Sequence, residues 1–292
     1  MLRRLAREYL PEWLAAVLRA VRAGVRGRGQ QAAKPPEWSV VPEGWAADDT
    51  RGQGWLHESI IAANVARIPT FLRTIEGAGL LGVDRNATAV SEQNRVAHGL
   101  ITAFSYVLAR AARGKDEIAV LDWGGGLGNY SQIARAALPE MRFLYTVHDL
   151  PPFCAAGRDV FPDVVFNADR ERVLARKYDV VFASSSIQYL RDWRNDIARI
   201  ARSADPWLYV TRLAMVRSVP TFVVVQRPHA YGYDTEYLSW IFNRDEFIAH
   251  IGSCGLVPER EFLVEERPLI AGAAEQCEER GILFRRIDGA RS

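Results

Sequence analysis

A glycine-rich segment in the middle of the chain carries the strongest chemical signal. An apolar run ends at Asp122, and residues 124–128 read Gly-Gly-Gly-Leu-Gly before a helical pattern begins. Glycines at the end of a strand let a ligand lie against bare backbone, where any Cβ would collide with it. The sixth position counted from Gly124 is Asn129, so the GxGxxG dinucleotide fingerprint fails in that register. The sequence also lacks GK[ST], which excludes a P-loop, and leaves the spacing DxGxGxG over 122–128.

The carboxylate at the start of this loop indicates the charge of the ligand. A negative charge at Asp122 would repel a pyrophosphate and suits a cationic group, such as the α-amino group of S-adenosylmethionine. Asp149 follows the last glycine of the loop by 149 − 128 = 21 residues, about where this architecture places a carboxylate for ribose hydroxyls. The simpler alternatives are a glycine turn that only packs strand on helix, and a solvated aspartate at a strand end. The two features together favour a nucleoside-containing cofactor.

Weaker signals stand at the ends of the next two strands. Asn167-Ala168-Asp169 follows one of them, and Ser184-Ser185-Ser186 follows the other. Small polar residues are common turn formers, so each group alone indicates little. Their shared position at the carboxyl edge of a sheet predicts that they border the same ligand.

Positioning these residues requires a sheet whose strands end at one edge. From residue 117 onward, short β-rich runs alternate with helical segments, which predicts a doubly wound, mostly parallel α/β sheet covered on both faces. A later run, 221–226, follows its predecessor without a helix, so we expect an antiparallel strand near the end of the sheet. The expected strands are 118–123, 143–148, 164–167, 179–183, 207–213, 221–226, 261–264 and 282–287, with a helix at 244–251.

Three segments precede or form this fold. Residues 1–30 contain an amphipathic basic helix at 2–26 and a linker rich in glycine. Its apolar stripe would pack on the body or on a second subunit, or else rest on anionic lipid with Trp13 at the boundary. Residues 37–115 read as an N-terminal helical cap with helices at 57–76 and 91–113, and residues 116–292 as the ligand-binding domain.

Composition limits the class of protein. With 292 residues, of which 49% are hydrophobic, the chain can bury a full core and is neither disordered nor fibrous. A net charge of +2 provides no field for nucleic acid, so we expect no nucleic-acid partner. The three cysteines have no metal-ligand or disulfide spacing, which predicts no metal and a reducing cytoplasm. No apolar run reaches the roughly 18 residues of a membrane span. Attachment to the inner membrane surface or to a protein through residues 2–26, and a homodimer, stay open.

The stretch 117–247 resembles class I S-adenosylmethionine-dependent methyltransferases. More narrowly, it resembles a bacterial methyltransferase family often found among genes for surface polysaccharides. The segments that carry this resemblance are 120–128, 185–190, 225–228 and 239–243. The glycine loop with Asp149-Leu150-Pro151 also resembles plant-type small-molecule O-methyltransferases. The resemblance covers nearly half of the chain and leaves out the N-terminal helix.

The resemblance implies a seven-stranded Rossmann-like methyltransferase sheet, with S-adenosylmethionine as cofactor and S-adenosylhomocysteine as product. It implies that the methionine part is held by Asp122, Gly124, Gly126 and Gly128, the ribose by Asp149, and the adenine by Leu150, Asn167 and Ala168, with Ser184 near the sulfonium. The chain departs from the plant-type enzymes after the fifth strand, where Arg212-Leu213 stands in place of a His-Asp pair. Their general base therefore cannot be carried over.

Five residues within reach of the sheet edge are candidates for the acceptor side, namely His229, Tyr231, Tyr233, Gln188 and Arg212. His229 lies in the loop 227–233 and could deprotonate a hydroxyl near neutral pH, although a plain surface histidine is an equal alternative. Arg212 could anchor an anionic acceptor such as a carboxylate, phosphate or uronate, or pair with a carboxylate such as Asp234.

These observations favour O-methylation of a hydroxyl on a small molecule or sugar, such as a surface glycan or a secondary metabolite. Methyl transfer is an in-line displacement, so positioning and desolvation can supply much of the catalysis. The alternative is a scaffold or regulatory subunit that binds S-adenosylmethionine or S-adenosylhomocysteine without turnover. An NAD-dependent oxidoreductase is disfavoured by the glycine spacing.

Overall fold

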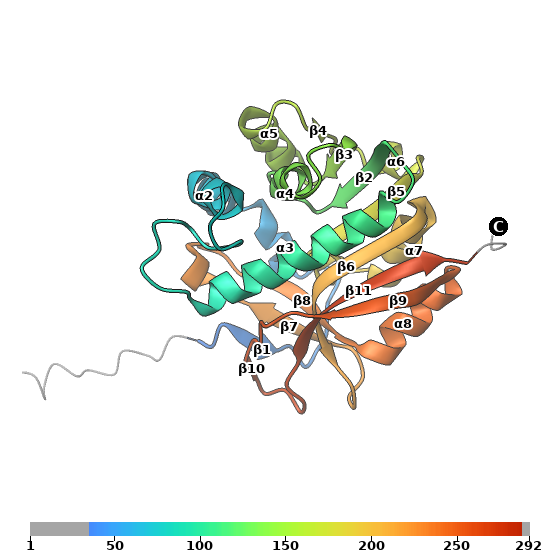
Figure 1. Cartoon of the computed structure of the whole chain (residues 1–292). Coiled ribbons are helices and arrows are strands. Elements are labelled where there is room, and N and C mark those ends of the chain that lie inside the picture. The colour runs from blue at the N-terminus through green and yellow to red at the C-terminus, as the bar shows by residue number, and fades with distance from the viewer. Residues whose placement is uncertain (1–34, 288–292) are drawn as a thin grey trace, which may run out of the picture. The chain divides into compact units, whose positions relative to one another are not determined.

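Seven strands form the doubly wound sheet that the sequence predicts. The computed structural model describes residues 35–287, so the helix expected at 2–26 lies outside it (Figure 1). The strand order is β4–β3–β2–β5–β6–β11–β9, and all neighbours are parallel except β11, which runs antiparallel between β6 and β9. The strands are β2 (Glu117–Trp123), β3 (Arg142–His148), β4 (Val165–Phe166), β5 (Tyr178–Ser184), β6 (Ala204–Val216), β9 (Leu256–Leu263) and β11 (Glu278–Arg286).

Alternate side chains of the central strands pack into two separate cores, one on each face of the sheet. Val120 of β2 packs with residues of α3, α4 and α5, whereas its neighbour Leu121 packs with residues of α7 and α8. Both faces are therefore apolar, as expected for parallel strands covered by helices on both sides. The helices are α3 (Glu92–Ala111), α4 (Asn129–Ala137), α5 (Pro151–Val160), α6 (Arg170–Leu174), α7 (Trp193–Ser203) and α8 (Arg244–Ser253).

A four-stranded extension continues the sheet beyond β6. Strand β8 (Tyr237–Asn243) pairs with the end of β6 and is followed by β7 (Phe222–Gln226), β1 (Trp38–Val40) and β10 (Ile270–Ala271). Strands β1, β8 and β10 were not predicted. Strand β1 lies ahead of the two helices expected in the region 37–115, in a segment where the sequence pattern is irregular. Residues 37–287 belong to one compact unit.

The two helices expected in the cap are present, but one covers the sheet and the other contributes to the site. Helix α3 crosses the sheet (Figure 1), and its Phe104 and Leu108 are fully buried in the same core as Val180 of β5. It therefore belongs to the covering layer of the sheet. The 3-10 helix η2 (Thr50–Leu56) and helix α2 (Glu58–Ile75) are the parts that supply residues to the site described below. No helix in residues 35–287 is long and apolar enough to cross a membrane.

Candidate functional site

A cavity of about 580 Å³ lies at the carboxyl ends of β2, β3, β5 and β6. This is the edge of a doubly wound sheet where ligands bind. One side of the cavity is lined by the glycine loop and by residues that follow β3 and β5. The other side is lined by Trp55 of η2, Asn64 of α2, Tyr189 of the 3-10 helix η3 (Ile187–Tyr189), Arg212 of β6 and Tyr233 of the loop before β8.

The glycine loop has a backbone that other residues adopt only with strain. Gly128, at φ +85°, caps the N-terminus of α4, and a Cβ there would lie 2.9 Å from Cζ of Phe166. Gly124, at φ +67°, would place a Cβ 2.4 Å from Cβ of Ser186. The backbone N–H of Gly124 donates to the carbonyl of His148 at 2.7 Å, which ties the loop to β3. Glycine is therefore required for local geometry as well as for ligand access.

Asp122 is a buried carboxylate with one oxygen left unbonded. The hydroxyl of Tyr145 donates to its Oδ2 at 3.0 Å, whereas Oδ1 has no hydrogen-bond partner among the described residues. Burial, with a smaller contribution from the charge of Asp149, raises the pKa of Asp122 to about 7. A Cβ at Gly125 would lie 2.5 Å from Cγ of Asp122, so this glycine, which the sequence did not single out, makes room for the carboxylate. A buried polar atom without a partner is costly, and a cationic ligand would relieve that cost.

Asp149 stands at the end of β3 and closes the other side of the glycine loop. Its Oδ2 accepts the backbone N–H of Gly126 at 2.7 Å, and its Oδ1 accepts the backbone N–H of Leu150 at 2.7 Å. Burial raises the pKa of Asp149 to about 6, although these two bonds oppose the shift. The Leu150 side chain is 38% exposed and lines the cavity, which provides an apolar surface beside the carboxylate.

The structure brings most of the expected site residues to this cavity. Its lining includes Asp122, Gly124, Gly126, Asp149, Leu150, Ala168, Ser184 and Arg212. Gly128, Asn167 and His229 are not part of the lining. Asn167 accepts a hydrogen bond on its carbonyl from Nδ1 of His148 at 2.9 Å and so supports the lining from behind.

His229 lies at the start of the 3-10 helix η4 (His229–Tyr231), where its Nδ1 is 3.2 Å from the carbonyl oxygen of Tyr233. A general-base role for His229 therefore stays a prediction from the sequence. The side chain that this loop presents to the cavity is Tyr233.

Arg212 pairs with a carboxylate that the sequence did not indicate. Its Nη2 is 2.9 Å from Oε2 of Glu266, whereas Asp234 instead donates its backbone N–H to Ser59. Arg212 adopts φ +54°, which is uncommon for a residue other than glycine and points to a functional or packing constraint. Burial raises the pKa of nearby Glu279 to about 8, although the charge of Arg212 opposes the shift.

On the other side of the cavity the sequence indicated Tyr233 and Arg212 but missed Trp55, Asn64 and Tyr189. Trp55 stacks on Tyr237 with ring centroids 4.4 Å apart and meets Tyr189 edge-on at 4.8 Å. Asn64 donates through Nδ2 to the hydroxyl of Tyr233 at 2.9 Å. A tyrosine-rich loop gave a partial signal for Tyr233, but Asn64 has no sequence signal, because it is an isolated polar residue on a helix.

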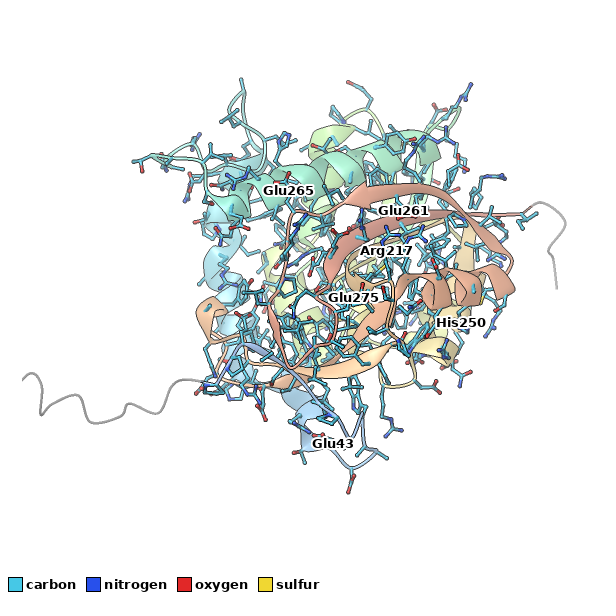
Figure 2. All side chains as sticks on the ribbon, turned by 90° about the horizontal axis from the view of Figure 1, so that it is seen from below. Glu43, Arg217, His250, Glu261, Glu265 and Glu275 are labelled. Carbon is cyan, nitrogen blue, oxygen red and sulfur yellow. The ribbon has the colours of Figure 1, made fainter. Side chains whose placement is uncertain are left out.

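The described residues do not favour a second site or a metal. A smaller cavity of about 210 Å³ is lined by charged residues that include Arg217, Arg244 and Glu275, on the side of the molecule shown in Figure 2. Arg244 pairs with Glu261, and Glu275 accepts the backbone N–H of Arg217 at 2.8 Å, so the charges of Arg244 and Glu275 already have partners. No group of three His, Cys, Asp or Glu residues in 35–287 could hold a metal ion.

Comparison with known proteins agrees with this geometry. Residues 95–246 match a family model described as a methyltransferase domain. No curated protein matches the sequence. The magnesium protoporphyrin IX methyltransferase of Synechocystis PCC 6803, with bound S-adenosylmethionine, is 16% identical with a TM-score of 0.51, over 83% of this chain and 100% of that chain.

Two further structures are less similar. The same Synechocystis protein with bound S-adenosylhomocysteine is 15% identical with a TM-score of 0.49, over 81% of this chain and 100% of that one. The 1,6-didemethyltoxoflavin-N1-methyltransferase of Burkholderia thailandensis is 16% identical with a TM-score of 0.41, over 70% and 93%. The structure with the TM-score of 0.51 supports a shared Rossmann-like methyltransferase fold and, at 16% identity, nothing finer. The family model covers more than half of the chain, and the protein therefore belongs to the methyltransferase-domain family.

Proposed function

We propose that this protein transfers a methyl group from S-adenosylmethionine to a hydroxyl group of a small molecule or sugar, such as a surface glycan or a secondary metabolite. The observation that carries the proposal is the buried carboxylate of Asp122 beside the glycine loop, one oxygen of which has no hydrogen-bond partner within residues 35–287. This oxygen can accept a hydrogen bond from a cationic ligand. A pyrophosphate would meet the negative charges of Asp122 and Asp149 in the same cavity.

The residues present fit each part of this cofactor. The methionine part would lie against Asp122, Gly124 and Gly126, and Gly128 would shape the loop. The ribose would contact Asp149, and the sulfonium would lie near Ser184. The adenine would contact Leu150 and Ala168, with Asn167 behind them. When bound, S-adenosylmethionine supplies an electrophilic methyl group on a sulfonium. A positive charge near Asp122 and Asp149 favours their ionised forms, which lowers both pKa values.

The other side of the cavity would receive the acceptor. Trp55, Tyr189 and Tyr233 supply aromatic surface there, and Asn64 and Arg212 supply polar groups. These side chains can orient an acceptor and exclude water from the methyl-transfer path, which is where positioning and desolvation act. The structure assigns no general base among them, and His229 and Arg212 stay candidates from the sequence.

Transfer of a labelled methyl group tests the proposal. The protein is incubated with methyl-tritiated S-adenosylmethionine and catechol, methyl glucoside or the low-molecular-weight fraction of a cell extract, and products are identified by mass spectrometry. We expect O-methyl products from the wild type and about tenfold less, or lower still, from an Asp149→Ala variant at subsaturating S-adenosylmethionine. Products methylated only on nitrogen or carbon would contradict the hydroxyl assignment. Binding of S-adenosylhomocysteine without any transfer would instead indicate a non-catalytic scaffold.

A further inference from the structure

Helix α2 and the loop before β8 hold each other on the acceptor side of the cavity. The Nδ2 of Asn64 donates to the hydroxyl of Tyr233 at 2.9 Å, and Asn64 also donates to the carbonyl of Ile60 at 2.8 Å within its own helix. One turn earlier, the Oγ of Ser59 accepts the backbone N–H of Asp234 at 3.0 Å. Both Asn64 and Tyr233 line the cavity. The position of the Tyr233 hydroxyl is therefore fixed by a second element that also belongs to the site.

The bonds to Tyr233 leave its hydroxyl proton unused. A phenol oxygen can accept two hydrogen bonds and donate one. Its acceptor positions are taken by Asn64 Nδ2 and by Arg67 Nη1, which lies 3.5 Å away, with the guanidinium carbon 5.6 Å from the ring centroid. Among the described residues, no protein atom accepts the hydroxyl proton of Tyr233. Solvent or a ligand in the cavity can accept this proton, because Tyr233 is only half-buried and lines the cavity.

The arginines in the cavity lining already have carboxylate partners. Arg212 is paired with Glu266, and Arg170, the other arginine in the lining, is paired with Asp196. An anionic acceptor would therefore find no unpaired arginine in the lining, and it would approach the carboxylates of Asp122 and Asp149. The guanidinium of Arg67 lies 3.5 Å from the Tyr233 hydroxyl, but it is outside the lining and exposed, so solvent screens its charge. The charges of the lining therefore favour an acceptor without charge.

We propose that Tyr233 binds and orients the acceptor by donating its hydroxyl proton to an oxygen of an uncharged compound. Asn64 is a positioning residue, which acts by holding Tyr233. This inference rests on the proposed function, since it assigns the acceptor half of the same site. This role of Tyr233 differs from that of an anion anchor at Arg212. Tyr233 is a neutral hydrogen-bond donor, so it requires an acceptor with an oxygen lone pair and not one with a negative charge.

Matched probes and variants test the assignment. The probes are catechol and methyl glucoside, their carboxylated counterparts 3,4-dihydroxybenzoate and methyl glucuronoside, and the extract fraction. The variants are Tyr233→Phe, Asn64→Ala, the double variant, and Tyr231→Phe as a control from the same loop, since the Tyr231 side chain is not part of the cavity lining. Methyl transfer gives kcat/KM for each acceptor, and calorimetry gives the Kd of S-adenosylhomocysteine.

We expect uncharged acceptors to be preferred by the wild type. Loss of one hydrogen bond to the acceptor should lower kcat/KM about tenfold in Tyr233→Phe, because ~1.4 kcal/mol corresponds to a factor of ten. Tyr231→Phe should match the wild type, and S-adenosylhomocysteine should bind all variants equally. The double variant should be no worse than Tyr233→Phe, because Asn64 acts through Tyr233.

Several results would overturn the assignment. A Tyr233→Phe variant as active as Tyr231→Phe, or a preference for carboxylated acceptors, would contradict it while leaving the methyltransferase function intact. A changed shape of the pH profile in Tyr233→Phe would indicate proton transfer rather than orientation. A wild type that neither binds S-adenosylhomocysteine nor transfers label would overturn the proposed function and this inference together.

Discussion

An Asp122→Asn variant should be more stable than the wild type at alkaline pH. Burial raises the pKa of Asp122 from an ordinary 3.8 to about 7, so the folded state binds this proton more tightly than the unfolded state does. The free energy of unfolding of the wild type therefore falls as the pH rises between these two values, and the full cost is present above about pH 7. Asparagine has a similar volume, carries no charge, and can still accept the Tyr145 hydroxyl.

The expected gain follows from the two pKa values. The interval from 3.8 to about 7 corresponds to at most about 4 kcal/mol, at ~1.36 kcal/mol per pH unit. At about pH 8 the variant should gain up to this amount, and at about pH 4 the two proteins should be nearly equal. The same variant should bind S-adenosylhomocysteine more weakly, because the carboxylate that we propose binds the ligand's amino group is gone.

Urea unfolding at both pH values measures this difference. Exchange of the exposed Asp159 for asparagine is the control and should change stability little at either pH. Equal stability of Asp122→Asn and the wild type at about pH 8 would refute the reasoning, as would a gain of the same size at about pH 4.

Three further predictions concern the surroundings of the site. Gly128→Ala should lower the free energy of unfolding by about 1–3 kcal/mol in urea, because of φ +85° and the contact with Phe166; unfolding identical to the wild type would contradict this. Glu266→Gln should lower the pKa of Glu279, because the charge of Glu266 helps to raise it. Carbon-13 NMR titration measures this pKa, and an unchanged value would contradict the coupling of Glu279 to Glu266. Dialysis against EDTA should leave methyl transfer unchanged, and activity restored by added Mg²⁺ would show that a metal is used.

The central fold could be predicted because its signals are local. Strand β2, the glycine loop and α4 follow one another in the sequence, and the alternation of strands and helices indicates the doubly wound order. Strand β1 is three residues long, too short for a recognisable period. Strand β8 is buried on both faces and pairs with β6 and β7, so neither alternation nor turn residues marked it.

The two sides of the cavity also differ in how far the sequence predicts them, because one side is built from local signals and the other is not. Strand ends carry the cofactor side, so Asp122 and Asp149 could be located from spacing alone. The acceptor side is assembled by long-range contacts, such as the bond between Asn64 and Tyr233, which are 169 residues apart. The pairing of Arg212 with Glu266 is another example, because that glutamate lies 54 residues away in an irregular segment.

Calorimetric titration with S-adenosylhomocysteine tests the central claim most directly. The wild type, Asp149→Ala and the control Asp159→Ala would be compared after urea unfolding has shown that each is folded. The account predicts micromolar binding by the wild type and the control, and a loss of at least about tenfold in Asp149→Ala, as expected when a charged hydrogen-bonding partner is removed. No binding by the wild type, or equal binding by all three proteins, would contradict the assignment of this cavity to S-adenosylmethionine.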